Sequence, residues 1–155
     1  MKAIYSGSFD PITVGHVDIA TRAGQMFDLT IGVAKNPDKS GMFHEQAKVN
    51  MIKKSIENID VLHFSDVVII NGLLADYCKN LHIPVIVRGV RNSTDFEYEM
   101  TMQRINKDLG VDTIFIPANP KYSHISSSAV RQLTRLNSCP KNYVPKCVYK
   151  ELLKI

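Results

Sequence analysis

The spacing of apolar residues alternates along the chain between a strand-like and a helix-like period. Short runs rich in β-branched residues predict five strands, at residues 2–5, 29–34, 60–64, 85–87 and 113–116. Apolar positions three and four residues apart predict helices, at residues 15–27, 45–58, 73–81, 94–109, 127–136 and 146–153. Residues 67–71 fit a strand, a loop or the approach to a helix, so the pattern leaves their structure open.

Strands and helices alternate five times, so the chain is expected to form an α/β fold as a single domain over residues 1–155. The pattern predicts a doubly wound, parallel five-stranded sheet with right-handed crossovers and helices on both faces. Ligands bind such sheets beyond the carboxyl ends of the strands. We therefore expect one edge of the sheet to collect the polar segments after strands one, two, four and five, which are residues 6–16, 35–39, 88–91 and 117–128.

The predicted helix at residues 94–109 carries apolar side chains at helical spacing. We expect Phe96, Met100 and Leu109 to face the core. Its first turn should be capped by the hydroxyl of Ser93 or Thr94.

Composition and charge narrow the class of protein. Apolar residues make up 45% of the chain and charged residues 22%, which is typical of a globular protein. The net charge of +4 suits an anionic ligand, although it is also ordinary for a soluble protein. Lysines and arginines form no run, so we expect no nucleic-acid partner.

The cysteines and the apolar runs indicate a cellular location. Cys78, Cys139 and Cys147 are odd in number and form no Cys-x-x-Cys pair. They predict reduced thiols in a cytoplasmic protein, with neither a disulfide framework nor a zinc site. No apolar run approaches the ~20 residues of a membrane span, and residues 1–8 become polar too soon for a secretory signal. We therefore expect no membrane partner.

The loop after the first strand has the features of a phosphate cradle. It lacks both the Gly-x-Gly-x-x-Gly and the Gly-Lys-Ser/Thr patterns of the common nucleotide loops. Gly7 and Gly15 would let the backbone approach a ligand, and Ser8 offers a hydroxyl. His16 lies in the first turn of a predicted helix, where N–H groups and the helix dipole favour an anion.

Two separated motifs resemble the signatures of the nucleotidyltransferase superfamily. Residues 8–11 read Ser-Phe-Asp-Pro, and residues 13–16 that follow are similar to the (H/T)-x-G-H signature. Residues 125–128 read Ile-Ser-Ser-Ser and resemble the second signature, which opens a helix. Either motif alone is modest, but their order around a βαβ array makes the resemblance specific.

A third segment narrows the resemblance to the phosphopantetheine adenylyltransferases. Residues 88–91 read Arg-Gly-Val-Arg, and residues 95–99 read Asp-Phe-Glu-Tyr-Glu. The resemblance covers nearly the whole chain, through Tyr-Val-Pro at residues 143–145. It implies a Rossmann-like nucleotidyltransferase fold. It also implies transfer of AMP from ATP to 4′-phosphopantetheine, which gives dephospho-coenzyme A and pyrophosphate in coenzyme A biosynthesis.

The resemblance also implies the residues that would act. His16 would stabilise the transition state, Lys39 would hold the attacking phosphate, and Arg91 and Ser127 would complete the catalytic set. The implied ATP-binding residues are Ser8, Phe9, His16, Gly89, Val90, Arg91, Glu99, Tyr122, Ser123, His124, Ile125, Ser126, Ser127 and Ser128. The implied acceptor-binding residues are Ser8, Lys39, Leu74 and Arg88. Mg²⁺ is expected with ATP, without a dedicated protein cage, and the implied assembly is a homo-hexamer.

Several of these residues also have a purely structural interpretation. His16 could be an ordinary histidine at a helix N-terminus, and Ser127 or Ser128 could simply cap the helix. Lys39, in a polar loop, could be a solvated charge. The presence of both signatures favours the functional interpretation.

Arg88 and Arg91 follow a buried strand, where guanidinium groups need anions. Ligand phosphates and the carboxylates of residues such as Glu97 and Glu99 could both serve. We favour ligand phosphates as the partners.

The chain departs from the family pattern in three places. Residues 67–71 form a longer stretch than the usual pattern just before Leu74, so the acceptor contacts there are open. Residues 43–48 read Phe-His-Glu-Gln-Ala-Lys where related sequences often carry a Leu-Glu-Glu-Arg-like run. Any contact made by that arginine is therefore open in this chain. Residues 119–121, before Tyr122, are also atypical.

Three other classes of function fit parts of the sequence: a different nucleotidyltransferase, a regulator and a nucleic-acid binder. A nicotinamide-mononucleotide adenylyltransferase or a glycerol-phosphate cytidylyltransferase would share both signatures, but residues 88–91 and 95–99 argue against them. A nucleotide-binding regulator without turnover would be free to lose one of His16, Lys39, Arg91 and Ser127, and all four are present. A nucleic-acid binder is suggested only by the pI near 9.0.

Overall fold

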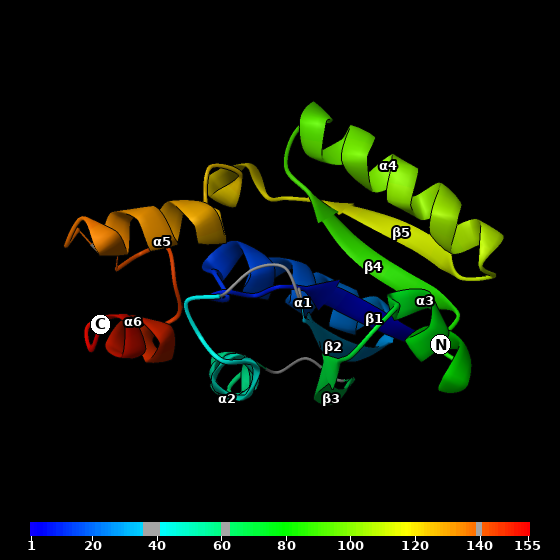
Figure 1. The fold of residues 1–155 in the computed structure, drawn as a ribbon, viewed down its shortest axis with the longest axis horizontal. Coiled ribbons are helices and arrows are strands. Elements are labelled where there is room, and N and C mark those ends of the chain that lie inside the picture. Colours follow the sequence, from blue (N-terminus) through cyan, green and yellow to red (C-terminus); the bar gives the residue numbers. More distant parts are fainter. Residues whose placement is uncertain (36–40, 60–62, 139–140) are drawn as a thin grey trace.

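The computed structural model describes residues 1–35, 41–59, 63–138 and 141–155. Its centre is a parallel sheet with the strand order β3-β2-β1-β4-β5 (Figure 1). The strands are β1 (Lys2–Gly7), β2 (Asp28–Ala34), β3 (Phe64–Ile70), β4 (Val85–Val90) and β5 (Asp112–Pro117). The helices are α1 (Val14–Met26), α2 (Glu45–Ile56), α3 (Leu74–Asn80), α4 (Ser93–Asp108), α5 (Ser127–Arg135) and α6 (Lys146–Leu152), with a 3₁₀ turn η1 (Pro120–Tyr122). The predicted α/β class and parallel five-stranded sheet are confirmed.

Side chains that alternate along β1 divide the core into two layers, as the period of a strand requires. Ala3 and Tyr5 pack in a layer that includes residues of α1, α2, α5 and α6. Ile4 packs in the other layer, with Ala75 and Cys78 of α3. Helices therefore cover both faces of the sheet, which makes it doubly wound. Figure 1 shows α4 running along β4 and β5, whereas α6 lies beside α2.

The third strand lies later in the chain than the sequence pattern predicts. A strand was expected at residues 60–64, but β3 begins at Phe64 and includes most of the open segment 67–71. Residues 60–62 lie outside the described residues. Since β3 is an edge strand, it tolerates the exposed Ser65 and Asp66 that break its apolar run. Pairing with β2, from Thr30–Asp66 to Ala34–Ile70, decides its position.

Helix α4 differs from the prediction in its cap and in its buried face. Asn92 is the N-cap, and its side chain accepts a hydrogen bond from the Asp95 N–H, so neither Ser93 nor Thr94 has that role. Phe96 is 42% exposed, although it was expected in the core. The residues that α4 buries fully are polar, Glu99 and Asn106. Of these two residues, Glu99 lies at the end of the sheet where the site is found.

The order of the strands determines where a ligand can bind. The chain builds outward from β1 through β2 to β3, then crosses to the other side of β1 to form β4 and β5. Connections leave β1 and β4 in opposite directions, which opens a crevice at their carboxyl ends. No helix in the described ranges is long and apolar enough to cross a membrane.

Candidate active site

A cavity of about 290 Å³ opens at the carboxyl ends of β1, β4 and β5. Three of the four segments expected at this edge contribute to it; of the fourth, residues 36–39 lie outside the described residues. The cavity is lined by many of the predicted site residues: Ser8, Phe9 and His16 after β1, Arg88, Gly89 and Arg91 at the end of β4, Glu99 on α4, and Tyr122, Ile125, Ser126, Ser127 and Ser128 after β5. Side chains far apart in sequence therefore meet at one site.

The imidazole of His16 is oriented by the start of its own helix. Thr13 is the N-cap of α1, and its side-chain oxygen accepts a hydrogen bond from the His16 N–H at 3.3 Å. In return, the Thr13 backbone N–H donates to Nδ1 of His16 at 3.1 Å. A ring nitrogen that accepts from a backbone N–H carries no proton, so the neutral ring has its proton on Nε2. This capping box leaves Nε2–H as a donor for an anion in the cavity.

The surroundings of His16 keep its ring neutral. Loss of hydration on burial, together with the positive charges of Arg91 and Arg88, lowers the pKa of His16 to about 4. At neutral pH the side chain therefore acts as a hydrogen-bond donor without a charge of its own.

This pKa shift predicts a dependence of stability on pH. Between pH 6.5, the ordinary histidine pKa, and about pH 4, the unfolded chain binds a proton at His16 that the folded chain does not. The contribution of His16 to the free energy of unfolding is therefore present above pH 6.5 and is lost as pH falls towards 4. We expect ¹⁵N chemical shifts at pH 6 to report a neutral His16 protonated on Nε2. A titration midpoint near 6.5 would contradict this assignment.

Phe9 forms a wall that supports His16. Its ring lies edge-on to the rings of Tyr5 and His16, with centroid distances of 5.2 Å in both pairs. The φ angle of Phe9 is 42°, in the left-handed region that residues with side chains seldom adopt. A Cβ on Gly7 would lie 3.2 Å from this ring, so the glycine makes room for Phe9. The unfavourable backbone conformation of Phe9 thus occurs at a residue whose ring holds the His16 imidazole in position.

Arg88 and Arg91 both pair with carboxylates of α4. The Arg88 guanidinium binds both oxygens of Glu99, with Nε 2.8 Å from Oε2, and also donates to the Ser6 carbonyl. Arg91 binds Asp95 through Nε at 2.7 Å. Carboxylates therefore serve as partners of both arginines, and Asp95, not Glu97, accompanies the expected Glu99. These two ion pairs hold both arginines at the cavity wall.

The start of α5 is tied to the loop after β1. Ser126 is the N-cap, with its side chain accepting from the Ala129 N–H at 3.1 Å, so neither Ser127 nor Ser128 caps the helix. The Ser127 hydroxyl donates to the Pro11 carbonyl at 2.8 Å. The first N–H groups of a helix have no partners within it. Those of α5 therefore open onto the cavity as an anion site.

Some predicted site residues are not brought to the cavity. Leu74 begins α3 and packs against the second core layer. Val90, Ser123 and His124 are also not among the lining residues that the structure describes. His124 packs against Tyr143 with a centroid distance of 5.4 Å. Lys39 lies outside the described residues.

Sequence reasoning assigned no binding or catalytic role to several residues of the site. Tyr5, Thr13, Asp95 and Arg131 line the cavity. Thr13 could have been found, because a threonine three residues before a polar side chain is typical of a capping box. Arg131 could have been found from its position four residues after Ser127, on the same face of α5.

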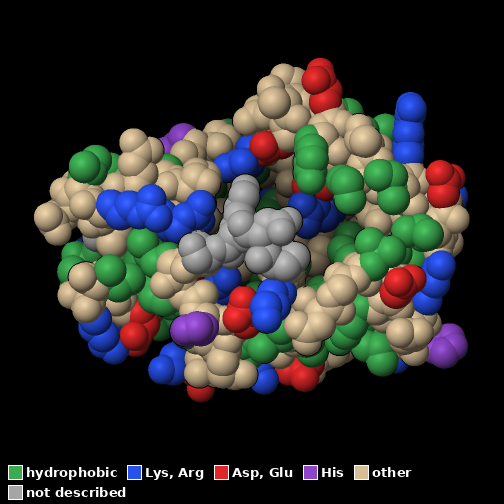
Figure 2. Space-filling view, in the orientation of Figure 1, with side chains coloured by type: hydrophobic (Ala, Val, Ile, Leu, Met, Phe, Trp, Pro, Cys, Tyr) green, Lys and Arg blue, Asp and Glu red, His purple; other side chains and the backbone are tan. Residues whose placement is uncertain are grey.

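Arg131 adds a third guanidinium to the cavity. Its Nη2 donates to the Ser128 hydroxyl at 3.1 Å, and its Nη1 donates to the Asp10 carbonyl at 2.6 Å. Figure 2 shows Lys and Arg side chains gathered along α5 on this face. Three arginines against the carboxylates of Asp95 and Glu99, with the N-termini of α1 and α5, give the cavity a positive potential. This suits a polyphosphate ligand.

The cavity offers no dedicated cage for a metal ion within the described residues. No group of three or more histidine, cysteine or acidic side chains there could hold one. The acidic groups of the cavity, Asp95 and Glu99, are engaged by arginines.

Known proteins share this architecture. The cytidylyltransferase-like family model matches residues 4–133. The Plasmodium falciparum nicotinic acid mononucleotide adenylyltransferase complexed with NaAD superposes with a TM-score of 0.70 at 18% identity, over 99% of this chain and 94% of that chain, a likeness of fold. Fold and cavity together define a nucleotidyltransferase of the cytidylyltransferase-like family.

Curated relatives narrow the family further. A phosphopantetheine adenylyltransferase of Clostridium novyi (strain NT) is 42% identical over 154 residues, which cover 97% of this chain and 94% of the relative. That of Caldanaerobacter subterraneus subsp. tengcongensis is 39% identical over 158 residues, which cover 98% of this chain and 95% of the relative. The chain belongs to the phosphopantetheine adenylyltransferase family.

Proposed function

We propose that this protein transfers AMP from ATP to 4′-phosphopantetheine and so forms dephospho-coenzyme A and pyrophosphate, a step of coenzyme A biosynthesis. The observation that carries the proposal is the neutral His16 donor, set between three arginines and the start of α5. The names of the relatives identify the acceptor. The rival acceptor nicotinic acid mononucleotide is supported only by a likeness of fold at 18% identity.

The reaction needs electrostatic help more than proton transfer. An oxygen of the acceptor phosphate attacks the α-phosphorus of ATP in line, and the bond from that phosphorus to the β-phosphate bridging oxygen breaks. The nucleophile is already an anion, so no general base is required. Charge that develops on the α-phosphoryl oxygens and on the leaving pyrophosphate must be stabilised by fixed donors.

The site residues supply those donors. His16 Nε2–H donates to the α-phosphoryl oxygen, and the capping box with Thr13 holds it in that orientation before ATP arrives. Arg91 and the N–H groups at the start of α5 receive the β- and γ-phosphates. Ser127 contributes through its backbone and through the bond that ties α5 to Pro11.

The roles proposed for the acceptor-binding residues rest more on the family resemblance than on contacts in the structure. Ser8 is exposed at the cavity and orients the acceptor phosphate. Arg88, held by Glu99, lines the same cavity. Lys39 is proposed to hold the attacking phosphate and Leu74 to contact the acceptor. A magnesium ion bound with ATP would be held mainly by phosphate oxygens and water, and it would supply positive charge at the pyrophosphate.

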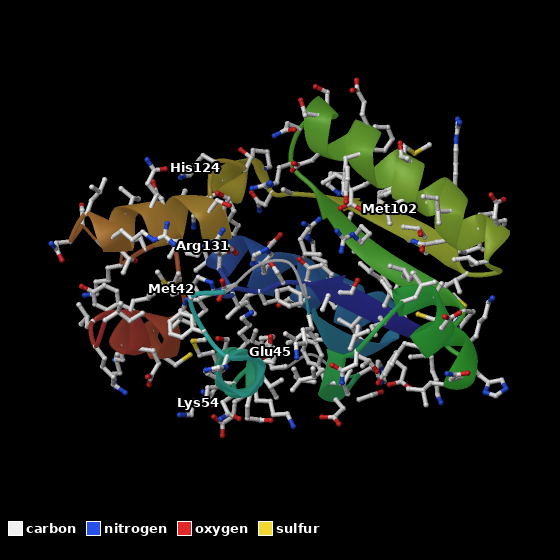
Figure 3. The ribbon with its side chains drawn as sticks, in the orientation of Figure 1. Met42, Glu45, Lys54, Met102, His124 and Arg131 are labelled. Carbon is white, nitrogen blue, oxygen red and sulfur yellow. The ribbon has the colours of Figure 1, made fainter. Side chains whose placement is uncertain are left out.

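We also propose a cytoplasmic homo-hexamer. Tyr98 and Ile105, one heptad apart on α4, are 65% and 45% exposed. Phe96, on the same helix, is 42% exposed and packs against Phe115. Figure 3 labels Met102 on this helix. Exposed apolar groups on one helix support self-association, and light scattering would give the mass of the assembly.

The proposed reaction is tested by the identity of its product. We expect the purified protein, given Mg-ATP and 4′-phosphopantetheine, to form dephospho-coenzyme A and pyrophosphate in equal amounts, as measured by mass spectrometry and a coupled pyrophosphate assay. Without the acceptor, neither should accumulate. Formation of ADP, or of AMP without dephospho-coenzyme A, would contradict the proposal.

A further inference from the structure

The carboxylate of Asp10 is a buried charge for which the reaction described above gives no role. Asp10 is 5% exposed and directly follows Phe9, which packs against His16. Its two oxygens accept hydrogen bonds from backbone N–H groups of a distant segment. Met42 donates to Oδ2 at 2.8 Å and Phe43 donates to Oδ1 at 2.9 Å. Asp10 therefore joins the loop after β1 to the segment that leads into α2.

Lys48 of α2 is buried against the same carboxylate. Lys48 is 5% exposed, and its Nζ lies 3.7 Å from Oδ1 of Asp10. A buried ammonium is costly unless it is paired. Lys48 also closes the run of residues 43–48 in which related sequences often carry an arginine. Lys48 therefore supplies a positive charge within the run in which related sequences often carry an arginine, and its partner is Asp10.

Gly41 shows how closely this segment packs on the ion pair. A Cβ at Gly41 would lie 3.0 Å from both Asp10 Oδ2 and Lys48 Nζ, so a side chain there would require the ion pair to shift. Arg131, from the cavity wall, approaches Asp10 Oδ2 to 3.9 Å. Figure 3 shows Arg131 on α5 and Met42 before α2 on the same side of the molecule. The carboxylate therefore lies where two segments that line the cavity, the loop after β1 and α5, meet residues 41–48.

We propose that Asp10 and Lys48 form a positioning pair for adenylyl transfer. Asp10 holds residues 41–43 against the loop that carries Phe9 and His16, and Lys48 holds the Asp10 carboxylate in place through the ion pair. The inference rests on the proposed function, since turnover is its principal readout. Neither side chain contacts the reacting atoms, and both act through the geometry of the loop after β1.

Neutral variants of similar shape test the pair. In Lys48→Met and Asp10→Asn we expect kcat per folded molecule to fall about 10- to 100-fold, as for other small misplacements of reacting groups, with the KM for ATP changed less than about threefold. Lys48→Arg should restore most of the turnover. Amide hydrogen exchange at Met42 and Phe43 should accelerate in Asp10→Asn, because the amide offers one acceptor oxygen in place of two.

The matched control lies on the same helix. Lys53 pairs with Asp66 at 3.2 Å, with both side chains more than half exposed, so Lys53→Met should keep wild-type turnover. Wild-type kcat in Lys48→Met and Asp10→Asn, with only a lower Tm, would overturn the inference. So would a Lys48→Arg variant no faster than Lys48→Met. If the wild type does not use 4′-phosphopantetheine, the proposed function fails. Unchanged amide exchange at Met42 and Phe43 in Asp10→Asn would separately overturn the positioning role.

Discussion

His16→Ala is expected to lower kcat about 100- to 1,000-fold, the range found when one preorganised transition-state donor is removed. The KM for ATP should change far less, because Arg91, Arg131 and the start of α5 still hold the phosphates. The loss is concentrated in turnover because Nε2–H is aimed, by the bond from the Thr13 N–H to Nδ1, before the reaction begins. Charge develops at its partner only in the transition state.

The measurement is steady-state pyrophosphate release by wild type and variant over a range of ATP concentrations. His63→Ala is the matched control, because His63 is exposed in the turn before β3, away from the cavity, and its replacement should leave both constants unchanged. The variant also loses half of a capping box, and the loss of a helix cap costs about 0.5–2 kcal/mol of stability, so rates are normalised to folded protein. A rise in KM with unchanged kcat would show that His16 only binds ATP.

Arg88→Ala is expected to destabilise the fold by ~3–5 kcal/mol, the usual cost of removing one partner of a buried ion pair. The side chain of Glu99 is only 10% exposed, and both oxygens of its carboxylate bind Arg88. Without the guanidinium it would be a buried charge without a partner. The Ser6 carbonyl would lose a hydrogen bond at the same time.

Arg91→Ala provides the matched comparison, three residues away on the same segment. Arg91 pairs with Asp95, which lies on α4 as Glu99 does. The Arg91 side chain is 38% exposed, so its removal should cost no more than ~1 kcal/mol of stability. Urea unfolding of both variants and of the Arg88→Met, Glu99→Gln double variant gives the comparison. The double variant should be more stable than Arg88→Ala, since it leaves no unpaired charge. Equal destabilisation by Arg88→Ala and Arg91→Ala would contradict this account.

Much of the fold could be predicted because buried parallel strands are continuous apolar runs. β2 and β4 have almost no exposed side chains within their apolar parts, so their positions follow from composition alone. The edge strand β3 was misplaced because Ser65 and Asp66 interrupt its run and only pairing with β2 reveals it. Phe96 was assigned to the core because helical spacing identifies a face without saying what covers it.

The sequence predicted which residues form the candidate site better than it predicted the contacts between them. The two signatures and residues 88–91 led to most of the lining, since the carboxyl ends of parallel strands meet at one edge. Glu99 was foreseen as a possible carboxylate partner of the arginines, but the pairing of Arg91 with Asp95 was not, because sequence spacing does not say which carboxylate of α4 each arginine reaches. Arg131, Asp10 and Lys48 belong to separate elements, so their meeting is a property of the folded chain.

The acceptor is the central claim, and one measurement tests it most directly. Pyrophosphate release is followed with Mg-ATP and, in separate reactions, 4′-phosphopantetheine, nicotinamide mononucleotide and glycerol 3-phosphate, with a parallel CTP series. We expect release with ATP and 4′-phosphopantetheine and only background in every other combination. Release with a different acceptor, or with CTP in place of ATP, would contradict the assignment of this chain as an adenylyltransferase acting on 4′-phosphopantetheine.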